Sequence, residues 1–131
     1  EKLKEIYPIK IGSLANPLDM PWIASSNVYL KVAIAAIDDD IDFVMLVSDA
    51  WRNLEEARFK NYYANLLGIK SHVESTDKIF VIILPDYPSE SRKLFHAKLV
   101  NDGFLVYISI EHAAKSFLKL YEYGKKRNVL V

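Results

Sequence analysis

The sequence IFVIIL at residues 79–84 is the most hydrophobic stretch of the chain, and it contains no charged residue. A strand that is apolar on both faces is typical of a buried strand in a parallel sheet. Two further apolar stretches, FVMLV at 43–47 and FLVYI at 104–108, have the same character, and IGSLA at 11–15 predicts a short first strand. We therefore expect about four strands, buried by helices.

Amphipathic segments separate these stretches. Helices are predicted over residues 26–37, about 54–67, about 89–101 and after Ser109. Ser25 or Ser26 is the expected N-cap of the first helix, and Gly68 is the expected end of the second. Asp102-Gly103 is expected to end the third helix, and Ser109 to cap the fourth, with Glu111 in its first turn. Alternation of strand and helix predicts right-handed βαβ units. The predicted fold is a three-layer, flavodoxin-like α/β sandwich with a mostly parallel sheet, formed by residues 1–131 as one domain.

The composition excludes several classes of protein. The 131 residues contain 17 Lys+Arg and 17 Asp+Glu, and this zero net charge disfavours a nucleic-acid-binding protein. Cysteine is absent, which excludes disulfides, thiolate zinc sites and a cysteine nucleophile, and fits a cytoplasmic location. The longest apolar run, residues 79–85, is far shorter than the ~20 residues of a membrane span, so no membrane association is predicted. The chain begins with Glu1 rather than Met, so we expect either a processed chain or a piece of a longer polypeptide.

Residues 48–53 (SDAWRN) follow a predicted buried strand and lead into a helix. A helix N-terminus offers free N–H groups and a partial positive charge, so Trp51, Arg52 and Asn53 are candidate phosphate-binding residues, with Ser48 in the adjacent loop. The alternative is that Asn53 only caps the helix while Arg52 is solvated. The carboxylate of Asp49 argues against an anion site unless it points away.

The other chemically active residues do not form a recognisable site. The three aspartates at 38–40 lie after a helix and before a strand, at the wrong edge of the sheet for a ligand, and a solvated turn is the favoured interpretation. His72, His96 and His112 have no metal-ligand spacing. We therefore predict neither a metal site nor a catalytic residue in this chain.

A phosphorelay receiver shares this fold class, and Asp49 has a position that suits a phosphate acceptor. The acidic cluster is misplaced for such a protein, however, and Ser109 and Ile110 stand where the lysine of a receiver would be sought. The tyrosines at 62, 63, 121 and 123 have helical spacing and are expected to be core or interface residues.

Both ends of the chain resemble a known family. Three segments resemble, in order, segments of NDP-forming acyl-CoA synthetases: NPLD at residues 16–19, IDDDIDFVMLV at 37–47 and GFLVYISIEHAAK at 103–115. This family is the ADP-forming acetate–CoA ligase group, which is related to succinyl-CoA synthetase. The similarity continues through LYEY at 120–123 and covers essentially the whole chain. It identifies the chain as the C-terminal CoA-ligase domain of the CoA-binding portion.

This resemblance implies a role within a larger enzyme. The family interconverts acyl-CoA, ADP and phosphate with free acid, CoA and ATP. The resemblance therefore implies that the parent enzyme binds CoA, Mg and either ADP or ATP. It implies no cofactor in this domain. The expected partners are the CoA-binding, phosphohistidine and ATP-grasp domains or subunits, and a homo-oligomer stays open. By resemblance, Trp51–Asn53 open the helix that points at the phosphohistidine, and Asn16 and Asp19 shape the adjacent loop.

Some residues depart from the family pattern. Met20-Pro21-Trp22 follows the first motif, where the family commonly has small residues or glycine. Two tryptophans and Asp49 lie close to the predicted phosphate site. The alternative prediction is therefore a degenerate, non-catalytic interaction or regulatory module with the same fold.

Overall fold

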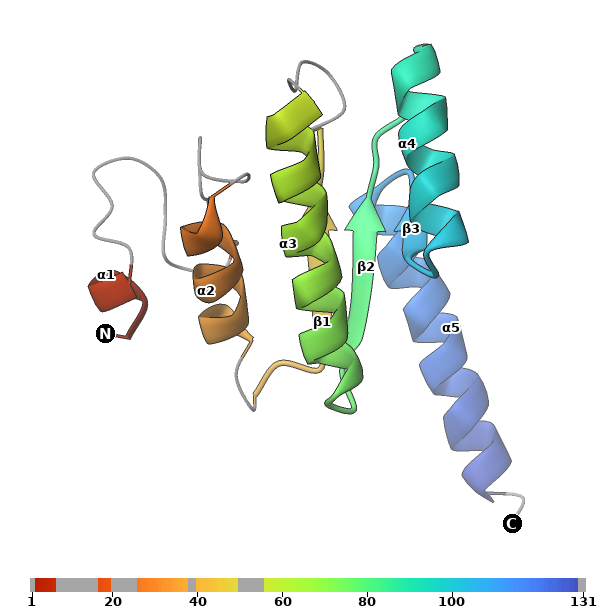
Figure 1. Ribbon diagram of the computed structural model, residues 1–131. Helices are drawn as coiled ribbons and strands as arrows, with labels where there is room; N and C mark the ends of the chain where they lie inside the picture. The colour runs from red at the N-terminus through yellow and green to blue at the C-terminus, as the bar shows by residue number, and fades with distance from the viewer. Residues whose placement is uncertain (1, 7–16, 20–25, 38–39, 50–55, 130–131) are drawn as a thin grey trace. The chain divides into compact units, whose positions relative to one another are not determined.

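Helices and strands alternate along the chain, as the hydrophobic pattern predicts (Figure 1). The computed structural model describes residues 2–6, 17–19, 26–37, 40–49 and 56–129. Its elements are α1 (Lys2–Ile6), α2 (Asn27–Ala36), β1 (Phe43–Val47), α3 (Glu56–Glu74), β2 (Ile79–Ile83), α4 (Glu90–Asn101), β3 (Leu105–Tyr107) and α5 (Ile110–Val129). The predicted strand at 11–15 lies outside the described residues.

The three strands form one parallel sheet in the order β1-β2-β3. The Ile79 N–H donates to the Asp42 carbonyl, and the Ser48 N–H donates to the Ile83 carbonyl, each at 2.9 Å, so β1 and β2 run in the same direction. Val81 pairs with Leu105 in the parallel β2–β3 ladder. The predicted α/β class with parallel strands is confirmed.

By the density of contacts, the chain divides into two compact units. The first comprises residues 1–44 and 50–80, and the second comprises residues 45–49 and 81–131. In the first unit α2 packs against α3. The rings of Tyr29 and Tyr62 lie 6.2 Å apart, and the Asn65 amide donates to the Ser26 carbonyl at 2.9 Å. This contact satisfies a polar side chain that is itself buried.

The α3 helix is longer than predicted. It continues through Gly68 to Glu74, so the prediction that Gly68 ends it is wrong. An interior glycine costs about 1 kcal/mol, but burial of Leu66, Ile69 and Val73 on one face outweighs this cost. Gly68 also has a packing role, because a Cβ there would lie 3.0 Å from the Leu30 side chain of α2.

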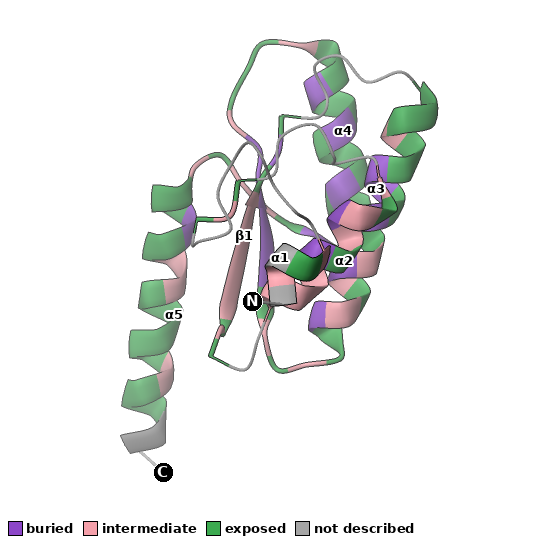
Figure 2. Cartoon of the chain, turned by 90° about the vertical axis from the view of Figure 1, so that its left-hand side faces the viewer, coloured by how far each residue is buried: buried purple, intermediate pink, exposed green. Residues whose placement is uncertain are grey.

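In the second unit, the predicted elements are found within one or two residues of their expected bounds. Phe95 and Leu99 of α4 are buried, and α4 packs on β3. Gly103 has φ 76°, a left-handed conformation that glycine adopts without steric cost, and it turns the chain from α4 towards β3 as predicted. In this unit Val81, Ile82 and Ile83 of β2 are buried, whereas α5 is exposed over most of its length (Figure 2).

The serine caps agree only in part with the sequence. Ser26 is at the N-cap of α2, but its hydroxyl accepts no hydrogen bond from the first turn. Ser89 caps α4, because its hydroxyl accepts from the Arg92 N–H at 3.2 Å. Across the described ranges, no helix combines the length and the apolar character that a membrane span requires.

Candidate functional site

The carboxyl ends of the three strands are the place to look for a site, because ligands of open α/β folds bind there. In the described chain this edge carries Ser48 and Asp49 after β1, residues 84–89 after β2, and Ile108 and Ser109 after β3. All of these residues belong to the second unit. Their arrangement can therefore be described as one local structure.

Ser48 is held firmly at this edge. It is 2% exposed, and its N–H donates to the Ile83 carbonyl at 2.9 Å, which extends the pairing of β1 and β2 beyond β1. Asp49, the next residue, is exposed. Two consecutive residues thus differ in environment: Ser48 is buried and hydrogen-bonded, whereas Asp49 is exposed to solvent. Such a carboxylate is free to point away from an anion bound at the edge.

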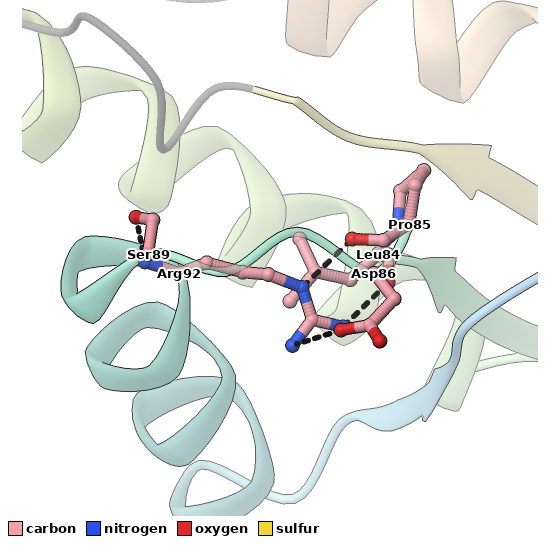
Figure 3. A network of polar contacts seen from close by, with 5 residues as sticks. All are labelled: Leu84, Pro85, Asp86, Ser89 and Arg92. Carbon is pink, nitrogen blue, oxygen red and sulfur yellow. Dashed lines mark hydrogen bonds and ion pairs between the residues drawn. The ribbon is translucent and has the colours of Figure 1, made fainter.

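Arg92 organises the connection between β2 and α4 (Figure 3). Its Nε donates to the Pro85 carbonyl at 2.7 Å, and one terminal nitrogen donates to the Leu84 carbonyl at 3.0 Å. The other terminal nitrogen lies 3.5 Å from a carboxylate oxygen of Asp86. The Arg92 side chain is 10% exposed, whereas that of Asp86 is 82% exposed. A buried cation therefore satisfies two carbonyls that follow the last pair of the β2 ladder.

Sequence reasoning missed Arg92. Arg92 is the third residue of α4, and its guanidinium reaches back over the cap to the end of β2. The available signal was a basic residue three positions after the Ser89 N-cap. A cation near a helix N-terminus opposes the helix dipole, so its presence there indicates a compensating local partner.

The N-terminus of α5 follows β3 at the same edge. The Ser109 hydroxyl accepts from the His112 N–H at 3.2 Å, and Glu111 lies in the first turn, both as predicted. The amino ends of α4 and α5 thus follow neighbouring strands, and each contributes a partial positive charge. The two helix ends favour an anion such as phosphate at this edge, whereas the carboxylates of Asp86, Glu90 and Glu111 oppose one.

The structure describes only some of the predicted site residues. Trp51, Arg52, Asn53 and Asn16 lie outside the described residues. Asp19 is described and exposed, but it belongs to the first unit, whereas Ser48 belongs to the second. The phosphate-binding role of these residues stays a prediction.

Of the remaining candidates that the structure describes, His112 lies at this edge, in the first turn of α5, and the others lie elsewhere. Asp38 and Asp39 are among the residues not described, and Asp40 is exposed. His72 lies in the last turn of α3, and His96 and His112 are exposed residues of α4 and α5. Within the described ranges, His, Asp and Glu residues form no group that could hold a metal ion.

Comparison of the chain with protein-family models, with curated proteins and with solved structures finds no match in any of the three.

Proposed function

We propose that this chain is the CoA-ligase domain of an NDP-forming acyl-CoA synthetase with a three-layer, flavodoxin-like fold. Within that enzyme it contributes a helix N-terminus to the phosphate or phosphohistidine site and packs against the other domains. The observation that carries the proposal is the resemblance at residues 16–19, 37–47 and 103–115, in order and with matching spacing. The other domains supply CoA, nucleotide, Mg and the phosphorylated histidine.

The geometry at the carboxyl edge supports an anion-binding role. The second motif ends with the last residue of β1, and the third runs through β3 and the loop after it into α5. Both therefore reach the edge at which parallel strands of α/β folds present their ligands. The amino ends of α4 and α5 add partial positive charge, while Arg92 is engaged with the backbone and leaves the loop after β2 rigid. On this proposal, residues 51–53 supply the N–H groups that contact phosphate, and Arg52 adds a charged contact.

A second function, as an interaction module that has lost the phosphate site, has its own support. Leu118, Leu120 and Tyr121 on α5 are each more than half exposed, at 57%, 60% and 61%. Exposed apolar side chains that gather on one element indicate a surface for a partner. The two functions differ in whether residues 51–53 respond to phosphate.

Backbone amide NMR during a titration with inorganic phosphate separates them. The synthetase role predicts saturable shifts at residues 51–53 at millimolar phosphate, which are lost in Arg52→Gln. Arg127→Gln is the matched control, because it removes the same charge from an exposed position on α5. Absence of any response at 51–53, or an equal loss in both variants, would refute the phosphate role and favour the module.

The size of the native polypeptide tests the parent enzyme. An antibody to this domain is expected to detect a band several times larger than 15.0 kDa, or a 15.0 kDa subunit that co-purifies with the other synthetase domains. A 15.0 kDa protein with neither these partners nor their acyl-CoA synthetase activity would contradict the proposal.

A further inference from the structure

The α5 helix presents an apolar stripe that its own unit leaves exposed. Ile110, Ala114, Leu118 and Tyr121 recur at the i, i+4, i+8, i+11 spacing of one helix face, and the three large side chains are 54%, 57% and 61% exposed. The strand on which α5 packs, β3, has three residues and spans about 10 Å. The 20 residues of α5 span about 30 Å, so β3 covers only part of the helix.

Contacts at the margin of the stripe fix the side of α5 that β3 occupies. Ala113 is fully buried, and the Phe117 ring lies 6.1 Å from that of Tyr107. The stripe of Ile110, Ala114, Leu118 and Tyr121 lies next to this buried side on the helix surface. A partner that covers it would therefore extend the apolar packing that β3 begins.

The charges along the other margin of the stripe identify the partner. Glu111, Lys115 and Glu122 lie on that margin, Lys125 lies at the C-terminal end of the stripe itself, and Leu118 is midway between Glu111 and Lys125. When the order of residues is reversed about Leu118, Glu111 and Lys125 exchange places. In an antiparallel pair of α5 helices centred on Leu118, Glu111 therefore faces Lys125 of the second copy, and Lys115 comes within one residue of Glu122. A parallel pair in register would instead bring the charged margin of each helix opposite the other margin of its partner, so it would not pair Glu111 with Lys125.

Contacts already present in α5 are compatible with this arrangement. Glu111 and Lys115 form an ion pair at 2.5 Å, with side chains 71% and 67% exposed. Such exposed pairs are weak, so their members can be shared with a second helix. The Lys125 ammonium lies 4.7 Å from the centre of the Tyr121 ring, which keeps its charge beside the stripe.

We infer that two copies of this chain associate through α5, antiparallel and centred on Leu118, with Glu111 of each copy paired to Lys125 of the other. The overlap from Glu111 to Lys125 spans about 20 Å of each helix. The inference goes beyond the proposed synthetase role, because it concerns a different surface and holds whether or not the chain binds phosphate.

A charge-exchange experiment tests this pairing. Sedimentation equilibrium of the 131-residue chain is expected to show a concentration-dependent mass that approaches twice 15.0 kDa. Glu111→Lys alone and Lys125→Glu alone should each weaken the dimer by about tenfold or more, because each places two pairs of like charges across the interface. The double variant Glu111→Lys with Lys125→Glu restores opposite charges and should recover most of the association.

Two further variants distinguish this interface from a general effect of charge on association. Leu118→Glu should abolish the dimer, because it places two carboxylates at its centre. Lys119→Glu makes a charge reversal of the same kind at an exposed position on the opposite side of α5 and should leave association unchanged. Far-UV circular dichroism verifies that each variant is folded. A chain that stays at 15.0 kDa at all concentrations, a double variant that does not recover, or an equal effect of Lys119→Glu would overturn the inference.

Discussion

Replacement of Arg92 by methionine tests whether this buried cation holds the end of β2. Methionine keeps an unbranched apolar stem of similar length but removes all five donors. The variant therefore loses the bonds at 2.7 Å and 3.0 Å to the carbonyls of Pro85 and Leu84. The ion pair with Asp86 contributes little, because the Asp86 side chain is 82% exposed.

The expected loss of stability follows from these contacts. A hydrogen bond from a charged donor contributes about 1.5–3 kcal/mol, and a buried carbonyl left unpaired carries a similar cost. Because the two bonds share one guanidinium and are not additive, we expect unfolding to become easier by about 2–4 kcal/mol. With a urea m-value of about 2 kcal/mol/M, the middle of the usual range, the midpoint should fall by about 1–2 M, which far-UV circular dichroism measures directly.

Two controls decide the cause of the loss. Lys93→Met removes a cation from the next residue of α4, where the side chain is 70% exposed, and should change stability by less than about 0.5 kcal/mol. Arg92→Lys keeps the charge but has a single nitrogen in place of the fork, so it should recover only part of the loss. An Arg92→Met effect no larger than that of Lys93→Met would refute the reasoning, and full recovery by lysine would mean that charge alone matters.

Three further predictions concern α3, the turn after α4, and α2. Asn65→Ala should destabilise the chain by about 1–2 kcal/mol more than Asn61→Ala, because Asn65 is buried and hydrogen-bonded to α2 whereas Asn61 is an exposed residue of the same helix. Equal urea midpoints for the two variants would contradict this. Gly103→Ala should cost about 1–2 kcal/mol because φ is 76°, and a calorimetric melting temperature unchanged from wild type would be evidence against that strain. Burial, and to a lesser extent the neighbouring Tyr62, raises the pKa of Tyr29 above its ordinary value of 10.0. The contribution of Tyr29 to the stability of the fold is therefore complete below pH 10 and is lost as the pH rises further. Above pH 10 the free energy of unfolding of the wild type, measured in urea, should fall by up to about 1.4 kcal/mol per pH unit. Tyr29→Phe should lack this fall, whereas the exposed control Tyr121→Phe should retain it. Identical alkaline profiles for the two variants would disprove the assignment.

Local sequence patterns were good guides to the elements of the fold. The apolar stretches at 43–47 and 79–84 became β1 and β2, because a strand without polar positions has to be buried on both faces. The Asp102-Gly103 pair marked the end of α4, because a left-handed residue terminates a helix whatever surrounds it. Gly68 misled the same kind of reasoning, since packing of α3 against α2 outweighs its propensity.

The candidate site was less accessible from the sequence. The pattern of strands located the loops at the carboxyl edge of the sheet, because parallel strands all end at the same edge. It assigned no role to Arg92, whose partners are backbone carbonyls of Leu84 and Pro85 rather than side chains. Every residue has a backbone carbonyl, so the sequence does not indicate which carbonyls a side chain will contact, and this contact is seen only in the folded chain.

Hydrophobicity and spacing within short segments were enough to predict the α/β class, the strands near 43–47, 79–84 and 104–108, and the order of charges along the last helix. Tertiary contacts were needed to show that α3 continues past Gly68, that Arg92 binds the end of β2, and that Tyr121 and Tyr123 stay exposed while Tyr62 and Tyr63 are buried. All four tyrosines have helical spacing in the sequence. Burial depends on which surface each helix meets, and that is a property of the packed chain.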